Sequence, residues 1–234
     1  MHFASRLKGE QNTAAFSWLL LTTALVCTPA FHLSADALTR AIVQLTSPAP
    51  SAPAPAVDPW AAPPFVLHSS SLAERKQAVN CLAAAVYFEA GTEPLEGQRA
   101  VAQVVLNRVR DRKFPGSVCG VVFQRAHRHI CQFSFVCDGS FRRRPPHAAQ
   151  LAHARTVAEQ ALAGRVTPEV GTATHYHATY VHPSWGRRLV KVDQIGAHIF
   201  YRRSGEAGAP SALTKRYAGG ELRVAGLDRQ LFRS

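Results

Sequence analysis

The segment AVNCLAAAVYFEAGTE, residues 78–93, combines an alanine-rich helical pattern with one acid near the end of that pattern. Counting back from Glu89 by helical spacing reaches Val86, Ala85 and Leu82, so the carboxyl group shares their apolar face. A carboxyl group that is poorly solvated has a raised pKa and stays protonated near neutral pH. That property is required of a general acid in glycosidic bond cleavage, and we therefore predict that Glu89 is catalytic.

A plainer alternative for Glu89 is a helix-end carboxylate that pairs with an arginine, either Arg99 or Arg108. Such surface ion pairs are common and contribute little to stability. Glu93 and Glu96 follow closely, and we expect both to face solvent or to cap a helix.

Sequence signals bound this helix at both ends. Ser71 and Glu74 form a capping-box pattern at its start, and Gly91 is typical of the position after a helix end. A second helix is expected over residues 95–110, whose valines follow helical spacing. The two helices form a tight hairpin with Glu89 at its turn.

The rest of the chain predicts shorter helices and a few strands. Residues 117–123 and 147–163 have helical patterns, while residues 172–177 and 196–201 are rich in aromatic residues and threonine, as strands are. The stretch beyond Arg203 is glycine-containing and basic, and we expect it to be loosely ordered in part.

The N-terminal part has the pattern of an export segment. Arg6 and Lys8 precede an apolar run over residues 14–31, and small residues follow it. The run is close to the roughly 18 residues of a membrane span, so a cleaved signal and an uncleaved anchor both stay open. A buried core helix is the third alternative. The chain is thus divided into four parts: residues 1–37, export signal or N-terminal membrane anchor; 38–68, proline- and alanine-rich linker; 69–203, folded domain; and 204–234, basic tail.

The net charge is +12, with arginine clusters at residues 142–144 and 187–188. For an exported chain this charge favours an anionic envelope polymer or a membrane surface as partner, and we expect no nucleic acid partner. A simple solvated face is the alternative.

Four cysteines, Cys81, Cys119, Cys131 and Cys137, lie in the part expected to be exported. An even number of cysteines in an oxidising compartment predicts two disulfides, and three pairings are open. The competing interpretation is a zinc site that adds His127 and His129 to three of these cysteines. No cysteine pair has the C-x2-C spacing of common zinc sites, so we expect disulfides and no metal or other cofactor.

Several residues outside the first helix are candidates for binding. His175 and His177 share one face of a strand because side chains alternate along it. With His182 or His198 they form a possible metal site, but we favour a sugar groove in which they and Tyr176 donate hydrogen bonds.

Two further candidates are less specific. Gln132 and Ser134 lie between Cys131 and Cys137, where a cross-link would fix them as hydrogen-bonding groups. The alternative is a structural loop whose phenylalanines fill the core. Trp185 fits either a stacking platform for sugar or a core anchor.

Taken together, these motifs resemble the SleB-type cell wall hydrolases, a family named for the spore cortex-lytic enzyme. The matching segments occur in the same order, cover about residues 80–202 and are LAAAVYFEAGTE (82–93), EGQRAVAQVVLNRV (96–109), CQFS (131–134) and IGAHIFY (195–201). The resemblance marks residues 69–203 as a cell wall hydrolase catalytic domain.

The resemblance implies an α+β fold, namely a lysozyme- or transglycosylase-like helical domain with a small antiparallel sheet and a glycan groove. It also implies that Glu89 is the catalytic acid. The implied substrate is the bond between N-acetylmuramic acid and N-acetylglucosamine in peptidoglycan glycan strands. We expect such an enzyme in the periplasm or cell envelope, either free or anchored to the inner membrane.

The number of acids favours one reaction over another. Retaining and inverting hydrolysis both use two carboxylates, whereas Asp138 and Asp193 are only spare candidates beside Glu89. A lytic transglycosylase needs one acid, because the muramoyl C6 hydroxyl is the internal nucleophile. We therefore expect a lytic transglycosylase. The alternatives are a metal-dependent amidase that uses His175 and His177, and a non-catalytic peptidoglycan-binding protein.

Overall fold

The structure is a computed structural model that describes residues 58–69, 71–127, 130–143 and 146–231. The predicted export segment and most of the predicted linker lie outside these residues. Among the residues described, no helix is both long and apolar enough to cross a bilayer. The following account concerns the compact unit to which all the described residues belong.

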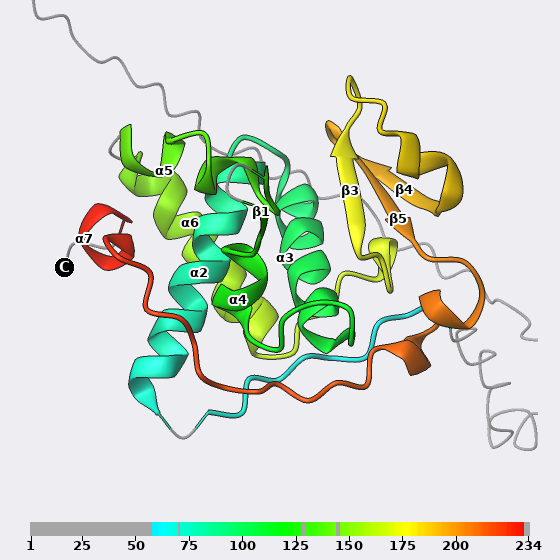
Figure 1. Cartoon of the computed structure of the whole chain (residues 1–234), viewed down its shortest axis with the longest axis horizontal. Helices are drawn as coiled ribbons and strands as arrows, with labels where there is room; N and C mark the ends of the chain where they lie inside the picture. The colour runs from blue at the N-terminus through cyan, green and yellow to red at the C-terminus, as the bar shows by residue number, and fades with distance from the viewer. Residues whose placement is uncertain (1–57, 70, 128–129, 144–145, 232–234) are drawn as a thin grey trace, which may run out of the picture. The chain divides into compact units, whose positions relative to one another are not determined.

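The centre of this unit is a group of helices around α2 (Figure 1). The central helix packs against three others, and the bounds are α2 Leu72–Ala90, α3 Leu95–Arg110, α4 Val118–Val122 and α6 Ala148–Leu162. All four were predicted within two residues. Every residue of α2 from Ala78 to Val86 is buried, so this helix is enclosed on all sides rather than on one face. Its alanines allow the neighbouring helices to approach closely.

The ends of α2 follow the sequence signals in part. The Ser71 hydroxyl accepts a hydrogen bond from the Glu74 backbone N–H, but the Glu74 carboxylate binds the Gly220 N–H instead of reaching back to Ser71. At the other end, a Cβ on Gly91 would lie 2.4 Å from the Tyr87 carbonyl oxygen. Glycine is therefore required there by close approach, and its φ of −61° is not left-handed.

A three-stranded antiparallel sheet packs against α3. Its strands are β3 (His175–Ala178), β4 (Val190–Ile195) and β5 (His198–Arg202), in the order β3-β5-β4. Tyr176 lies opposite Phe200, which is fully buried against α3. The sequence predicted β3 and β5 but not β4, and the observed α+β class with a small antiparallel sheet confirms the predicted fold class.

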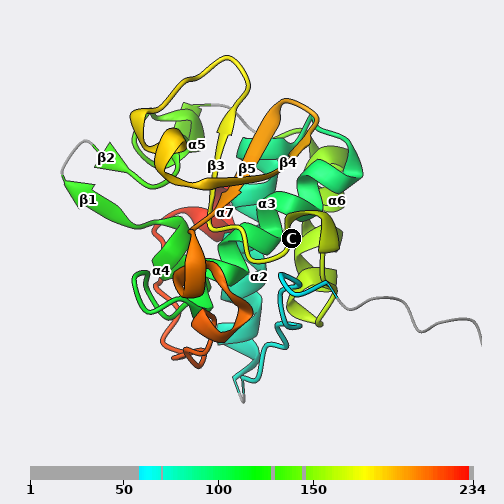
Figure 2. The ribbon, with the colours of Figure 1, turned by 90° about the vertical axis from the view of Figure 1, so that its right-hand side faces the viewer.

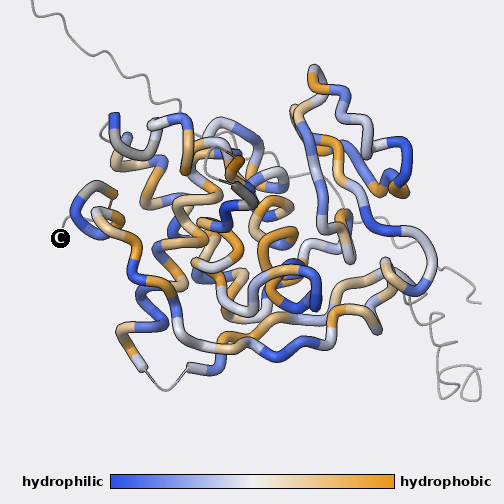
Figure 3. Tube along the Cα trace, viewed as in Figure 1, coloured by the Kyte–Doolittle hydropathy of each residue, from blue (hydrophilic) through white to orange (hydrophobic). Residues whose placement is uncertain are grey.

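Shorter elements complete the unit. Strands β1 (Arg125–His127) and β2 (Ile130–Cys131) form a small hairpin that projects from the domain (Figure 2). Figure 3 shows hydrophobic residues along the central helices and hydrophilic ones in the connection between β3 and β4. The remaining helical turns are η1 Ser134–Val136, α5 Ser140–Arg143, η2 Pro168–Val170, η3 Ser184–Arg188, η4 Gly205–Gly208, η5 Pro210–Ala212 and α7 Leu227–Leu231.

The folded unit extends beyond both predicted domain boundaries. Phe65 and Leu67 are buried in the core, although they lie in the predicted linker. The predicted loose tail also packs on the helices: Leu213 and Leu227 are buried, and the chain crosses the helical group to reach α7 (Figure 1). These apolar side chains, spaced widely among basic and glycine residues, explain why the tail is ordered despite its composition.

The four cysteines form two disulfides, Cys81–Cys119 and Cys131–Cys137. The first joins α2 to α4, and the second closes a short loop after β2. Because each of the four sulfurs is bonded to another sulfur in one of these two disulfides, the alternative of a cysteine zinc site is wrong.

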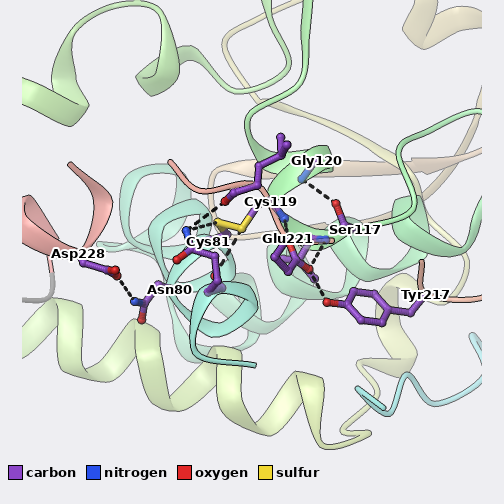
Figure 4. The surroundings of a disulfide bond; sticks show 11 residues. Asn80, Cys81, Ser117, Cys119, Gly120, Tyr217, Glu221 and Asp228 are labelled. Atoms are coloured by element: carbon purple, nitrogen blue, oxygen red, sulfur yellow. Dashed lines mark hydrogen bonds between the residues drawn. A yellow bond between two sulfur atoms is a disulfide. The ribbon is translucent and has the colours of Figure 1, made fainter. Parts of the chain in front are cut away.

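The tail is fixed beside the first disulfide (Figure 4). The buried Glu221 carboxylate accepts hydrogen bonds from the backbone N–H groups of Val118, at 2.9 Å, and Cys119, at 2.7 Å. It also accepts one from the Tyr217 hydroxyl, at 2.9 Å. A buried carboxylate with three donors holds the tail against the start of α4.

Candidate active site

Glu89 lies in the last turn of α2, and its side chain is partly buried. The Tyr176 hydroxyl, on β3, donates a hydrogen bond to Glu89 Oε2 at 3.1 Å. Burial raises the pKa of Glu89, while the Tyr176 hydrogen bond and the charge of Arg108 oppose that rise. The shift of the Glu89 pKa is thus in the direction that the sequence predicted, and the ionised form still has partners that stabilise it.

Arg108 is the cation that acts on Glu89, but it does so without a direct ion pair. The described residues contain no salt bridge between the two groups within 4 Å. Arg108 is 4% exposed; its Nε donates to the Thr174 carbonyl at 2.7 Å, and its guanidinium lies 5.4 Å from the centre of the Phe114 ring. Burial lowers the pKa of Arg108 to about 10, so it stays charged at neutral pH. The simple surface ion pair considered from the sequence is therefore not formed.

Glu89 opens onto a cleft of about 740 Å³ at the end of α2. Its walls come from α2, the α2–α3 turn, α5 and α6, and the lining residues are Tyr87, Phe88, Glu89, Gly91, Thr92, Ser140, Arg143 and Gln150. The Tyr87 hydroxyl accepts a hydrogen bond from the His147 N–H at 2.9 Å, which braces the start of α6 against α2. Apart from Glu89, sequence reasoning named none of these as site residues. Arg143 was noted only for its charge, and nothing local in the sequence marks Ser140 or Gln150.

The loop closed by Cys131 and Cys137 supports the cleft. Phe133 and Phe135 are buried, and the Phe135 ring stacks on Phe88 with ring centres 4.6 Å apart. The intervening Gln132 and Ser134 are exposed. The structural-loop alternative is therefore correct for the phenylalanines. Of the two exposed polar residues, Ser134 forms a side-chain hydrogen bond with Asp138.

Asp138 is a second carboxylate whose charge acts on Glu89. Its slight burial would raise its pKa, but hydrogen bonds from Ser140 and the charge of Arg143 lower it overall. The Ser140 N–H donates to Asp138 Oδ1 at 2.7 Å. The pKa of the exposed Asp138 is therefore shifted in the opposite direction to that of Glu89. Asp193 lies on β4 and accepts a local bond from the Gln194 N–H.

The predicted groove residues of β3 are divided between its two faces. Tyr176 reaches Glu89, whereas His175 and His177 both contact Trp185, with ring centres 5.5 Å apart in each pair. Side chains alternate along a strand, so Tyr176 and its neighbouring histidines cannot share a face. The structure thus brings Tyr176 to Glu89 and gathers His175, His177 and Trp185 elsewhere.

The histidines do not form a metal centre. His177 Nδ1 donates to the Ala178 carbonyl at 2.9 Å, and Nε2 accepts from the Tyr201 hydroxyl at 3.0 Å. His175 Nδ1 is within 2.9 Å of the Thr174 hydroxyl. Throughout the residues described, no group of three or more potential ligands is arranged around one point. This geometry gives the metal-dependent amidase no support.

Glu93 has a structural position close to the site. Its Oε2 accepts a hydrogen bond from the Ala197 N–H at 2.9 Å, in the turn between β4 and β5. Gly196 in that turn has φ +56°, and a Cβ there would lie 1.9 Å from the same carboxylate oxygen. The contact fastens the sheet to the α2–α3 turn, and hence holds Tyr176 near Glu89.

Comparison with known proteins gives a consistent result. Residues 92–201 match the sequence profile of the family described as Cell Wall Hydrolase. The matched segment starts three residues after Glu89. The chain is 36% identical over 127 residues to the spore cortex-lytic enzyme of Bacillus subtilis strain 168, covering 52% of this chain and 36% of that protein. It is 34% identical over 122 residues to the spore cortex-lytic enzyme of Halalkalibacterium halodurans, covering 52% and 34%. The chain thus spans little more than a third of the length of these relatives.

Solved structures of SleB catalytic domains are also similar. The catalytic domain of the Bacillus cereus SleB protein is 30% identical, with 58% of this chain and 95% of that chain covered and a TM-score of 0.46.

Proposed function

Because residues 92–201 form a domain of the cell wall hydrolase family, we propose that this protein is an exported enzyme that cleaves peptidoglycan glycan strands. Glu89 is its general acid and base, and the target is the bond between N-acetylmuramic acid and N-acetylglucosamine. The observation that carries the proposal is the Tyr176–Glu89 hydrogen bond at the edge of the 740 Å³ cleft. This bond joins a residue inside the matched segment to an acid whose pKa is raised. An acid with a shifted pKa that lines a cleft is expected of an active site.

The reaction that fits one buried acid is lytic transglycosylation. Protonated Glu89 gives its proton to the oxygen of the leaving N-acetylglucosamine as the glycosidic bond breaks. The resulting carboxylate then takes the proton of the muramoyl C6 hydroxyl, and that oxygen bonds to C1 to give a 1,6-anhydro product. Tyr176 and Arg108 stabilise the carboxylate between these two steps.

Asp138 defines the competing reaction. A carboxylate with a lowered pKa that acts on one with a raised pKa resembles the arrangement of a two-carboxylate hydrolase, in which Asp138 would activate water or attack C1. Its exposure and its bond from the Ser140 N–H favour a structural role, so we assign the internal C6 hydroxyl as nucleophile.

Two observations support location outside the cytoplasm. The described residues contain two disulfides, and disulfides persist in oxidising compartments. Residues 1–37 have the basic start and apolar middle of an export segment, which either is cleaved or anchors the protein to the inner membrane.

Mass spectrometry of the soluble products tests this proposal. The full chain and its Glu89→Gln variant are incubated with purified peptidoglycan. We expect 1,6-anhydro muropeptides from the wild type alone. Muropeptides with reducing ends would contradict the transglycosylase assignment and make Asp138→Asn the next variant, whereas binding without any product would contradict the enzyme itself.

A further inference from the structure

A second cavity lies on the face of β3 that carries His175. It has a volume of about 280 Å³ and is distinct from the cleft at Glu89. Its lining combines three cationic side chains with three rings, Lys113, Arg188, Arg203, Phe114, His175 and Trp185, together with Leu189 and no acid. None of the proposed catalytic steps uses this cavity.

Two of its cations are available to a ligand. Arg203 is already bonded to the Asp111 carboxylate and to the Ala207 carbonyl. Lys113 and Arg188 are exposed, and neither has an ion-pair partner in the part of the chain that the structure describes. The cavity therefore holds two uncompensated positive charges at its rim.

The electrostatic environment of His175 agrees with this description. Burial, together with the charges of Arg108, Arg203 and Lys113, lowers the pKa of His175 to about 4, against the opposing charge of Asp111. The imidazole is thus neutral at physiological pH and adds an apolar wall, while the surrounding cations make the cavity positive. An anion is the ligand that such a site takes.

Size and shape narrow the ligand further. Pockets of about 300–1,000 Å³ take drug-sized molecules, so 280 Å³ suits a single amino-acid residue and not a disaccharide. The Trp185 indole, 5.5 Å from His175 between ring centres, offers a flat surface for an aliphatic side chain.

We propose that this cavity binds a free carboxylate of the peptide stem that peptidoglycan carries on its muramic acid. Arg188 and Lys113 pair with the carboxylate, and Trp185 packs against the side chain of the same residue. This inference rests on the proposed function, because it assumes that the glycan in the Glu89 cleft carries such a stem. It makes the enzyme selective for glycan that still carries peptides.

Arg108 contacts a residue of the cavity and acts by its charge on the acid of the cleft. The Phe114 ring is a wall of the cavity and lies 5.4 Å from the Arg108 guanidinium, whose charge acts on Glu89.

Calorimetric titration of the full chain with the stem tripeptide L-Ala-γ-D-Glu-meso-diaminopimelate tests the binding directly. A charge-assisted pair is worth enough that Arg188→Ala should weaken binding about tenfold. Arg187→Ala is the matched control, because Arg187 lies in the same turn and does not line the cavity. The methyl ester of the tripeptide should bind the wild type as weakly as the tripeptide itself binds Arg188→Ala. Equal tripeptide binding by wild type, Arg188→Ala and Arg187→Ala, or no binding by the wild type, would overturn the proposal. Inorganic phosphate that fails to compete with the tripeptide in the wild type, and that binds Arg188→Ala as well as the wild type, would also overturn it.

A second measurement separates this inference from the proposed function. Cleavage is compared on peptide-bearing glycan strands and on strands stripped of their peptides. We expect the wild type and Arg187→Ala to prefer the peptide-bearing strands, and Arg188→Ala to lose that preference. If neither substrate is cut while tripeptide binding still depends on Arg188, the cavity stands and the catalytic proposal fails. If both are cut at equal rates by every protein, the catalytic proposal stands and the cavity's role fails.

Discussion

The hydroxyl of Tyr176 lies 3.1 Å from Oε2 of Glu89, so a strand of the sheet contacts the acid at the end of helix α2. The two residues are 87 positions apart in sequence, and no local pattern connects them. The proton affinity of Glu89 therefore depends on how the sheet is held against the helices.

Tyr176→Phe should shift the pH profile of cleavage. The hydroxyl lowers the pKa of Glu89, so its removal raises that pKa. Because the general acid acts in its protonated form, activity falls as pH rises through the pKa of Glu89. The descending limb of the profile should thus move to higher pH, and the maximal rate should fall about tenfold because the carboxylate loses a donor. Tyr180→Phe, at an exposed tyrosine, is the control and should leave the descending limb and the maximal rate unchanged. A descending limb that does not shift in Tyr176→Phe would refute the effect of the Tyr176 hydroxyl on the pKa of Glu89.

Gly196→Ala should cost more than Gly205→Ala. Both glycines have φ +56°, so the strain of a left-handed alanine is the same at each. Only at Gly196 would the added Cβ meet another group, the Glu93 carboxylate at 1.9 Å. Urea unfolding should show the larger loss for Gly196→Ala, together with a loss of activity as Tyr176 moves from Glu89. Equal losses in the two variants would show that the Glu93 contact does not hold the sheet.

The two disulfides should differ in their contributions. Their closed loops are 38 and 6 residues long, and the chain-entropy relation gives about 4 kcal/mol for Cys81–Cys119 and about 2 kcal/mol for Cys131–Cys137. Paired Cys→Ala variants, compared by urea unfolding, check the order. Loss of Cys131–Cys137 should nevertheless lower activity more, because its loop carries Phe135 against Phe88 in the cleft wall. The reverse order of stability would contradict the entropic account.

Glu221→Ala should destabilise the protein by about 3 kcal/mol. It leaves the backbone donors of Val118 and Cys119 and the Tyr217 hydroxyl without their buried acceptor. Glu206→Ala, at an exposed acid of the same C-terminal region, should have no comparable effect. If chemical denaturation shows equal stability for the two variants, the tail is not fastened as described.

Local signals predicted the helices well and the site only in part. Alanine-rich periodicity and a following glycine located α2, and the position of Glu89 at its end followed directly from them. The same pattern suggested one apolar face, although α2 is buried on all sides. Strand β4, Val190–Ile195, was not predicted, although apolar and polar residues alternate at its start. Its polar residues resemble those of the loop before it.

The remaining site residues required the tertiary structure. Strand alternation puts His175 and His177 on one face and Tyr176 on the other, so the prediction that all three line one groove is wrong for Tyr176. Ser140 and Gln150 reach the cleft only because α5 and α6 pack across the end of α2. The order of the C-terminal tail depends on the buried Leu213 and Leu227 and on one buried carboxylate, Glu221, which composition alone does not reveal.

The most direct test of the central claim is the rate at which full-length wild type, Glu89→Gln and Glu96→Gln release soluble fragments from purified peptidoglycan. Circular dichroism and thermal unfolding first establish that all three are folded. Glu96 is an exposed acid on the adjacent helix and provides the matched loss of one charge. We predict that Glu89→Gln loses at least about a thousandfold in rate, as expected when the proton donor of a general-acid reaction is removed, while Glu96→Gln cleaves like the wild type. Cleavage by folded Glu89→Gln at a rate close to that of Glu96→Gln would contradict the assignment of Glu89 as the catalytic acid.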